Sequence, residues 1–179
     1  MSNKTLFISG SPRAGNTEHV ISELAKQTKG EKEILLLRNK NIRHCCGCLT
    51  CHDRPVCSIK DDDITDVSGR VKAADVLVIG TPNYFENVSG LLKDLIDRLH
   101  PFYKTKELAG KKTILFMVGG GGEAGNKKYL ELCTEGFIKH YGLDLVRSYS
   151  FSALQAKDLE KDQTSSEIIR SIADLINTL

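Results

Sequence analysis

Five of the six cysteines in this 179-residue chain lie in one short segment, residues 44–57, with the sequence HCCGCLTCHDRPVC. Four of these thiols follow the spacing C-x2-C-x2-C-x5-C, which allows them to surround one small inorganic group. Four thiolates are the usual ligand set of a [4Fe–4S] cluster. Structural zinc also takes four thiolates, but usually as two pairs separated by a dozen or more residues, and this run is too compact for that arrangement. The predicted metal ligands are Cys45, Cys48, Cys51 and Cys57.

Other interpretations of the segment stay open at this stage. They are reduced thiols without metal, bound zinc, and a regulatory disulfide. Cys46 falls between the ligand positions and is expected to be a bystander, although a shift of the turn would let it replace Cys45. We expect His44 and His52 to be solvated loop residues, and Cys133 to be a small buried hydrophobic side chain.

The composition is that of an ordinary globular chain. It is 40% apolar and 27% charged with a net charge of +2, which predicts one domain over residues 1–179 with a cysteine-rich loop at 41–60. Basic residues are scattered among acidic ones, so no nucleic-acid partner is expected. No apolar run reaches membrane-span length and the first residues lack a signal-peptide layout, so we expect a cytoplasmic protein without a membrane partner. In a reducing compartment, clustered thiols indicate a metal or redox site.

Short apolar runs alternate with periodic amphipathic segments along the chain. Because this alternation repeats five times, it predicts an α/β fold with a parallel sheet covered by helices on both faces. The expected strands are 5–10, 33–38, 75–80, 112–120 and 143–151. The expected helices are 17–27, 61–74, 88–99, 126–142 and a last one that opens with a capping box at Thr164 and Glu167.

Three connections of this predicted sheet have the composition of a ligand site. In open parallel sheets, ligands bind beyond the carboxyl ends of the strands. The connection after the first strand is rich in donors and opens a helix that Asn16 or Thr17 can cap, which favours a phosphate over a simple strand–helix turn. Neither common nucleotide fingerprint is present. The expected phosphate contacts are Ser9, Ser11, Arg13, Asn16 and Thr17.

The other two connections suit a flat ring. Tyr84 and Phe85 follow the third strand and can flank a planar ring system, or fold back into the core. Four consecutive glycines, residues 119–122, follow the fourth strand and permit close backbone approach to a ligand, or form a flexible connector. Together the three connections predict a bound mononucleotide with a flat ring.

Three stretches carry a family resemblance: SGSPRAGNTEHVI (9–21), GTPNYFENVSGLLKDLIDR (80–98) and CSIKDDD (57–63). They resemble the flavodoxin-fold NAD(P)H-dependent FMN reductases and, among these, the iron–sulfur flavoproteins. The resemblance implies a three-layer, doubly wound, five-stranded parallel sheet of order 2-1-3-4-5, with FMN at its carboxyl edge and NAD(P)H as co-substrate. It also implies a homodimer or higher homo-oligomer with the cysteine loop near a subunit contact. Asn83 replaces a frequent Val, and DDD replaces the usual DDM.

The resemblance also assigns roles to individual residues. The five donors of the first connection would hold the FMN phosphate, the second connection would line the isoalloxazine, and the glycines would approach the ring. Tyr84 is the best candidate for a catalytic residue beside the reacting face. The ring-binding residues implied are Pro82, Asn83, Tyr84, Phe85, Asn87, Gly119, Gly120 and Gly121.

The preferred function is an FMN-dependent redox protein that uses NAD(P)H or ferredoxin as donor, with a [4Fe–4S] cluster on the cysteine loop. Its redox partner would be a small molecule or a protein. An alternative is a cluster-free NAD(P)H-dependent reductase of free flavin, quinones or azo compounds. A third is a non-catalytic zinc or thiol sensor on an empty flavodoxin-like scaffold, which the donor-rich first connection disfavours.

Overall fold

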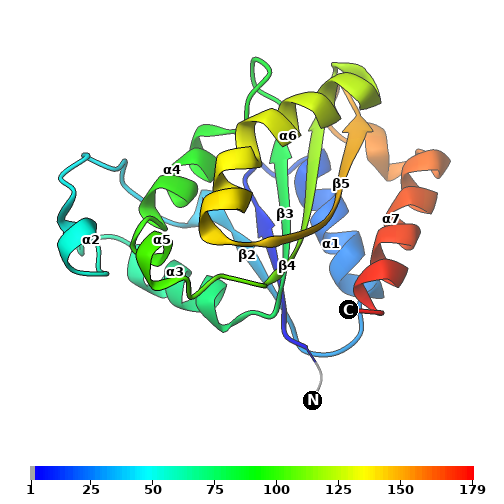
Figure 1. The fold of residues 1–179 in the computed structure, drawn as a ribbon. Helices are drawn as coiled ribbons and strands as arrows, with labels where there is room; N and C mark the ends of the chain where they lie inside the picture. Colours follow the sequence, from blue (N-terminus) through cyan, green and yellow to red (C-terminus); the bar gives the residue numbers. More distant parts are fainter. Residues whose placement is uncertain (1–2) are drawn as a thin grey trace.

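The computed structural model describes residues 3–179 and places a five-stranded sheet between two layers of helices (Figure 1). Every neighbouring pair of strands is parallel, and the strand order is β2-β1-β3-β4-β5. The expected doubly wound fold and strand order are therefore confirmed. The strands are β1 (Thr5–Ser9), β2 (Lys32–Leu36), β3 (Val76–Pro82), β4 (Lys112–Gly119) and β5 (Asp144–Ser152).

Side chains of the central strands are buried on both faces of the sheet, because helices cover each face. In β1, Leu6 and Ile8 pack into one core and Phe7 into the other, as the two-residue period of a strand requires. The first core lies under α3, α4, α5 and α6, and the second under α1 and α7. The helices are α1 (Asn16–Gln27), α2 (Thr50–Asp53), α3 (Ile64–Ala73), α4 (Gly90–Arg98), α5 (Pro101–Thr105), α6 (Gly122–Tyr141) and α7 (Gln163–Ile176), with 3-10 turns η1 (Leu37–Asn39) and η2 (Asp158–Glu160).

Several helix starts differ from the sequence prediction: α3 and α4 begin two or three residues later than expected, and α6 and α7 differ in ways that change the interpretation. Helix α6 begins at Gly122, so the glycine tract is a tight strand-to-helix turn and not a long loop. The expected capping box of α7 is wrong, because Asp162 is the N-cap residue and accepts a hydrogen bond from the backbone N–H of Ser165. An aspartate carboxylate caps a helix as well as a threonine hydroxyl does, and here it lies at the right position.

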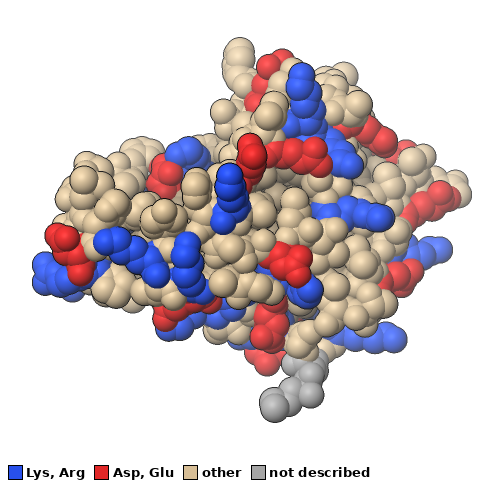
Figure 2. Space-filling view, viewed as in Figure 1, with Lys and Arg blue, Asp and Glu red and all other residues tan. Residues whose placement is uncertain are grey.

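The cysteine-rich segment leaves the sheet after η1 and projects from the side of the molecule beside α3, α4 and α5 (Figure 1, cyan). Its one regular element is α2, a single helical turn. On the face shown in Figure 2, lysines and arginines are interspersed with acidic side chains. Among residues 3–179, no helix combines the length and the apolar character needed to cross a bilayer.

Candidate functional site

The connection from β1 to α1 ends in a helix N-terminus that no side chain caps. Gly15 is the N-cap residue of this twelve-residue helix, and no side chain accepts a hydrogen bond from the first turn. The expectation that Asn16 or Thr17 caps the helix is therefore wrong. Both residues, together with Gly15, line a cavity of about 170 Å³. Uncapped N–H groups and the helix dipole favour an anion at this position.

The polar side chains of this connection have different roles. The Ser11 hydroxyl donates to the carbonyl of Arg13 at 2.7 Å and so shapes the turn itself. The Asn16 amide donates to the carbonyl of Gln155 at 2.7 Å, which holds the connection after β5 in place. The Arg13 side chain is exposed at the cavity. Arg13 thus offers a guanidinium to an anion, whereas Asn16 is engaged within the protein.

The connection after β3 forms a tight turn that presents one aromatic ring to the cavity and the other to solvent. Phe85 and Glu86 have φ angles of 50° and 64°, and the backbones of Tyr84 and Asn87 exchange hydrogen bonds of 3.0 and 3.1 Å. Tyr84 lines the cavity, but the Phe85 side chain is fully exposed. Phe85 therefore neither packs into the core nor lies at the cavity wall of this chain. Left-handed backbone at a bulky residue carries strain.

Asn126, in the first two turns of α6, joins three strand ends and was not predicted from the sequence. Its buried amide donates to the carbonyls of Gly119 at 2.8 Å and Phe151 at 3.2 Å. Its carbonyl oxygen accepts a hydrogen bond from the Asn83 amide at 2.8 Å. The ends of β3, β4 and β5 are thereby held together at the cavity. The sequence signal that could have indicated Asn126 is its polar side chain on the otherwise largely apolar buried face of α6.

Packing within the protein requires Gly119, the last residue of β4, whereas the contact at Gly120 is the movable end of the exposed Leu154 side chain. A Cβ atom on Gly119 would lie 2.6 Å from the Cβ of Asn83. A Cβ atom on Gly120 would lie 2.3 Å from a methyl group of Leu154. Both distances are shorter than carbon atoms tolerate, so the backbone here approaches side chains of the chain itself. Leu154 is 79% exposed and covers this part of the cavity.

Most of the predicted flavin contacts meet at this one cavity. Of the predicted residues, those that line it are Ser11, Arg13, Asn16, Thr17, Pro82, Asn83, Tyr84, Gly119 and Gly120. Those that do not line it are Ser9, Phe85, Asn87 and Gly121. Four lining residues were not predicted: Gly15, Val118, Ala153 and Leu154. The last two follow β5, whose carboxyl end the sequence reasoning left out.

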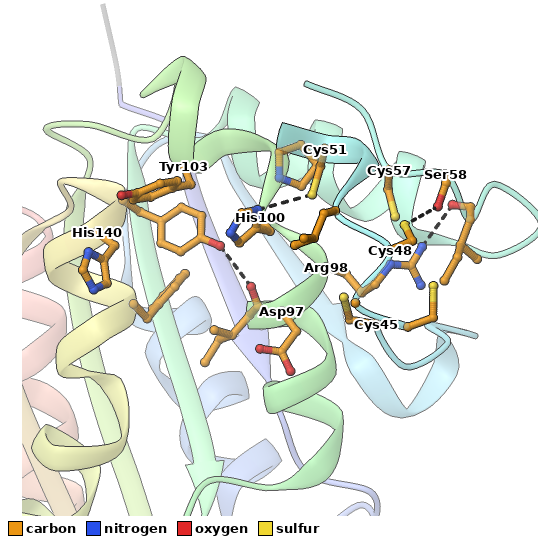
Figure 3. A pocket seen from close by; sticks show the side chains of 18 of the residues that line it. Cys45, Cys48, Cys51, Cys57, Ser58, Asp97, Arg98, His100, Tyr103 and His140 are labelled. Carbon is orange, nitrogen blue, oxygen red and sulfur yellow. Dashed lines mark hydrogen bonds between the residues drawn. The ribbon is translucent and has the colours of Figure 1, made fainter. Parts of the chain in front are cut away.

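A second and larger cavity, of about 670 Å³, lies between the cysteine segment and the C-terminal parts of α4 and α6 (Figure 3). In residues 3–179, no three His, Cys, Asp or Glu side chains converge closely enough to hold a single metal ion. The thiols are thus spread along the cavity wall instead of meeting at one point. All five cysteines of the segment line it: Cys45, Cys46, Cys48, Cys51 and Cys57.

The thiols of this cavity differ in acidity. Hydrogen bonds with the hydroxyls of Ser58, at 3.0 Å, and Thr50, at 3.4 Å, stabilise the Cys48 thiolate and lower its pKa to about 6. Burial raises the pKa of Cys51, and repulsion from the neighbouring thiols raises it further. A cationic group bound among them would remove this repulsion.

Imidazoles lie next to the thiols. The Cys51 sulfur is 3.3 Å from Nδ1 of His100, and the ring of His100 stacks on His52 with centroids 5.0 Å apart. His44 contacts Asp94 at 2.7 Å and does not line the cavity. His44 and His52 are both exposed, as expected, and His52 in addition stacks on His100. Cys133 is half-buried against the core, close to its expected role.

The two cavities have no lining residue in common. The small cavity lies where α6 begins, whereas the large one is lined by Gly136, Phe137 and His140 near its end. The rise along α6 from Gly122 to Gly136 is about 21 Å. The two cavities are therefore separate within one chain, and the position of the thiols beside the ring site stays a prediction.

A doubly wound parallel sheet of order β2-β1-β3-β4-β5, with an uncapped helix N-terminus at its carboxyl edge, defines a flavodoxin-like fold. Residues 3–157 match the family of NADPH-dependent FMN reductases. The chain belongs to this family, and with it to the FMN-dependent oxidoreductases.

Relatives agree with this assignment, and a solved structure agrees with the fold. An "iron-sulfur flavoprotein" of Archaeoglobus fulgidus is 44% identical over 98 residues, which are 53% of this chain and 48% of the relative. The chain thus spans about half the length of that relative. An "iron-sulfur flavoprotein" of Methanosarcina thermophila is 29% identical over 98% of this chain and 96% of its own. The structure of an NADH:FMN oxidoreductase in its apo form superposes with a TM-score of 0.68 at 20% identity, covering 99% of this chain and 89% of that one.

Proposed function

We propose that this protein is an FMN-binding oxidoreductase that also holds a [4Fe–4S] cluster on Cys45, Cys48, Cys51 and Cys57. NAD(P)H or a ferredoxin would be the electron donor. The observation that carries the proposal is that all four thiols of the C-x2-C-x2-C-x5-C motif line one cavity of about 670 Å³. Two relatives described as iron–sulfur flavoproteins support the same conclusion.

The residues at the carboxyl edge fit the phosphate end of FMN. The uncapped α1 N-terminus, the Arg13 guanidinium and the Thr17 side chain surround the small cavity. Its volume of about 170 Å³ is below the roughly 300–1,000 Å³ of typical small-molecule pockets, so one chain encloses only part of a group as large as FMN. Tyr84, 43% exposed, provides an aromatic surface for the ring at the cavity mouth.

The cysteine cavity fits a cluster better than a single ion. A cubane cluster takes one thiolate at each of four separated irons, whereas zinc needs four thiolates around one point. The thiols here are spread out, and their mutual repulsion favours a cationic inorganic core. FMN supplies two-electron and one-electron chemistry and a cluster supplies one-electron transfer, so this chain's residues have to position the groups and not to act as acid or base.

The separation of the two cavities favours an assembly of several copies. A homodimer or larger homo-oligomer can bring the carboxyl edge of one chain towards the cysteine cavity of another. Sedimentation analysis tests this part of the proposal, and a monomer at micromolar concentration would contradict it.

The spectrum of anaerobically purified protein, recorded before and after dithionite, tests the function. We expect flavin absorbance together with broad absorbance near 400 nm that bleaches on reduction, and about four irons and four sulfides per chain. Flavin without iron or sulfide would support the cluster-free NAD(P)H-dependent reductase. Zinc without flavin would support the sensor.

A further inference from the structure

Arg98, the last residue of α4, is buried beneath the cysteine segment. Its side chain has no exposed surface, and it is the largest of the fully buried side chains among residues 3–179. A buried guanidinium is costly unless it is paired. The groups that contact Arg98 therefore show how its buried charge is compensated.

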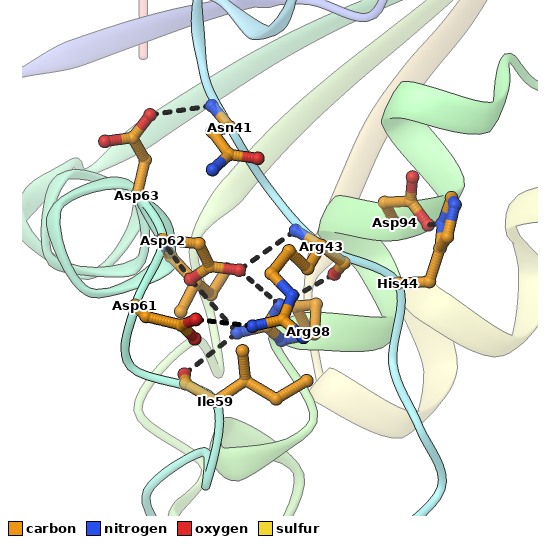
Figure 4. Close-up of polar contacts among 10 residues, drawn as sticks. Asn41, Arg43, His44, Ile59, Asp61, Asp62, Asp63, Asp94 and Arg98 are labelled. Atoms are coloured by element: carbon orange, nitrogen blue, oxygen red, sulfur yellow. Dashed lines mark hydrogen bonds and ion pairs between the residues drawn. The ribbon is translucent and has the colours of Figure 1, made fainter.

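The terminal nitrogens of Arg98 hold both ends of the cysteine segment (Figure 4). Nη1 donates to the carbonyl of Arg43 at 2.7 Å, just before the first cysteine of the motif. Nη2 donates to the carbonyl of Ile59 at 3.1 Å, just after the last one. The two ends of the segment are thus joined through one side chain.

Asp62 completes this junction. Its carboxylate accepts from both terminal nitrogens of Arg98, at 2.6 and 3.2 Å, in a forked ion pair. It also accepts from the backbone N–H groups of Arg43 at 2.9 Å and Ile64 at 3.1 Å. Two-point pairing of this kind suits arginine and not lysine.

One donor of Arg98 remains free. Its Nε–H is buried and has no hydrogen-bond partner among the described residues. Arg98 lines the cysteine cavity, and so does Cys57. A buried, unpaired N–H beside sulfur ligands is a donor for a group held there.

We propose that Arg98 is a positioning residue for the group bound by the cysteines: it fixes both ends of the segment through Asp62 and offers its Nε–H and positive charge to the sulfurs. This inference rests on the proposed cluster. A fixed positive charge favours the form of the site that carries one more electron. Arg98 therefore raises the reduction potential of the bound cluster in addition to holding the loop.

A purely structural role makes a different prediction. If Arg98 only held the two ends of the segment together, its replacement would change how much iron is retained. It would not change the reduction potential of the clusters that remain bound. The midpoint potential separates the two roles, because it depends on the charge beside the cluster.

The experiment compares three variants of the anaerobically purified full-length protein. Arg98→Lys keeps the positive charge but cannot form the two-point ion pair with Asp62. The double variant Arg98→Gln with Asp62→Asn removes both charges and leaves no unpaired ion, which protects the fold. Arg43→Gln is the matched control, because its side chain pairs with Asp61 at the surface of the same segment, with exposed fractions of 54% and 73%. FMN content reports whether the rest of the protein is intact.

We expect Arg98→Lys to lose iron while its remaining clusters keep a midpoint potential close to that of the parent. The double variant should lose iron and show a more negative potential, because Arg98 lines the cysteine cavity whereas Asp62 does not, so the lost positive charge is the nearer one. Thermolysin should cut within residues 44–60 about tenfold faster or more in both Arg98 variants than in the parent, since the segment opens more readily. Arg43→Gln should match the parent in all three measurements.

An unchanged potential in the double variant would overturn the electrostatic role, and an unchanged cleavage rate would overturn the positioning role. If the parent protein holds no iron, the cluster itself is refuted and the electrostatic role falls with it. The thermolysin rates then still decide whether Arg98 positions the segment.

Discussion

The side-chain amide of Asn83 donates to the side-chain carbonyl of Asn126 across 2.8 Å and thereby joins the turn after β3 to the start of α6. Through its own amide, Asn126 also holds the carbonyls of Gly119 and Phe151. One buried side chain thus fixes the mutual position of three strand ends. The shape of the small cavity depends on this arrangement.

Asn126→Ala should loosen the carboxyl edge of the sheet. The carbonyls of Phe151 and Gly119 would each lose a hydrogen bond, although Gly119 keeps the one from the backbone N–H of Ala153 at 3.1 Å. A lost buried hydrogen bond costs about 1–3 kcal/mol in the free energy of unfolding. We expect urea denaturation to show this loss and flavin fluorescence titration to show about tenfold weaker FMN binding. Asn39→Ala, at an exposed asparagine that does not line the cavity, is the control. Full FMN affinity in Asn126→Ala would contradict the role assigned to Asn126.

Arg13→Gln should weaken the binding of FMN and leave the binding of riboflavin unchanged. The Arg13 guanidinium lies at the cavity beside the uncapped α1 N-terminus, where it can pair with a phosphate but not with the ring. Hydrogen bonds to charged groups contribute about 1.5–3 kcal/mol, so the dissociation constant for FMN should rise roughly 10–100-fold. Calorimetry with both ligands measures the difference.

The control for this experiment is Arg38→Gln, because Arg38 pairs with Glu18 at 2.8 Å and does not line the cavity. Its FMN affinity should equal that of the parent. If Arg13→Gln lost the same affinity for FMN as for riboflavin, Arg13 would not contact the phosphate.

Single cysteine substitutions should separate ligands from bystanders. Serine at position 48 or 57 should remove the iron and the absorbance near 400 nm while FMN stays bound, because the two cavities have no lining residue in common. Cys46→Ser and Cys133→Ser should keep both chromophores. Iron and flavin analysis of these four purified variants and of Cys45→Ser measures this. If Cys46→Ser lost its iron and Cys45→Ser kept all of it, Cys46 would be the ligand and Cys45 the bystander.

Stability should fall in acid through Asp62. Burial alone would raise the pKa of this carboxyl, but the hydrogen bond from Arg98 and those from two backbone N–H groups outweigh it and lower the pKa. A lowered pKa in the folded state means that the ionised carboxylate stabilises the fold. Its contribution is complete above the ordinary aspartate pKa of about 4 and is lost as the pH falls through the lower, folded-state pKa.

Asp62→Asn tests this pH dependence. At pH 7 the variant should be less stable by about 3–5 kcal/mol, because Arg98 keeps its buried charge without a counter-ion. The difference from the parent should shrink below pH 4, where Asp62 itself becomes protonated. Urea unfolding of metal-free protein between pH 3 and 7 measures both curves. A difference that persists unchanged at pH 3 would contradict the assignment.

The strands and the longer helices could be predicted from the sequence, because they follow from the spacing of apolar residues. Ile169, Ile172 and Ile176 mark the buried face of α7 by their spacing alone. Helix ends were less predictable, since several neighbouring residues are able to serve as the N-cap residue. At α7 the carboxylate of Asp162 lies at the N-cap position, ahead of the predicted threonine.

The type of fold, the three connections that approach one edge of the sheet and the crowding of the thiols all follow from local patterns of residues. Which side chains remain available to a ligand depends on how distant parts of the chain pack together. Asn16 is engaged with Gln155, and Phe85 points into solvent, although both stand in a promising local pattern. In the sequence, Arg98 and Asn126 look like ordinary helix residues. Their roles become visible only in the folded structure, where residues distant in the chain surround them. Periodicity is a local property of the backbone, whereas a hydrogen bond between distant segments depends on how the whole chain packs.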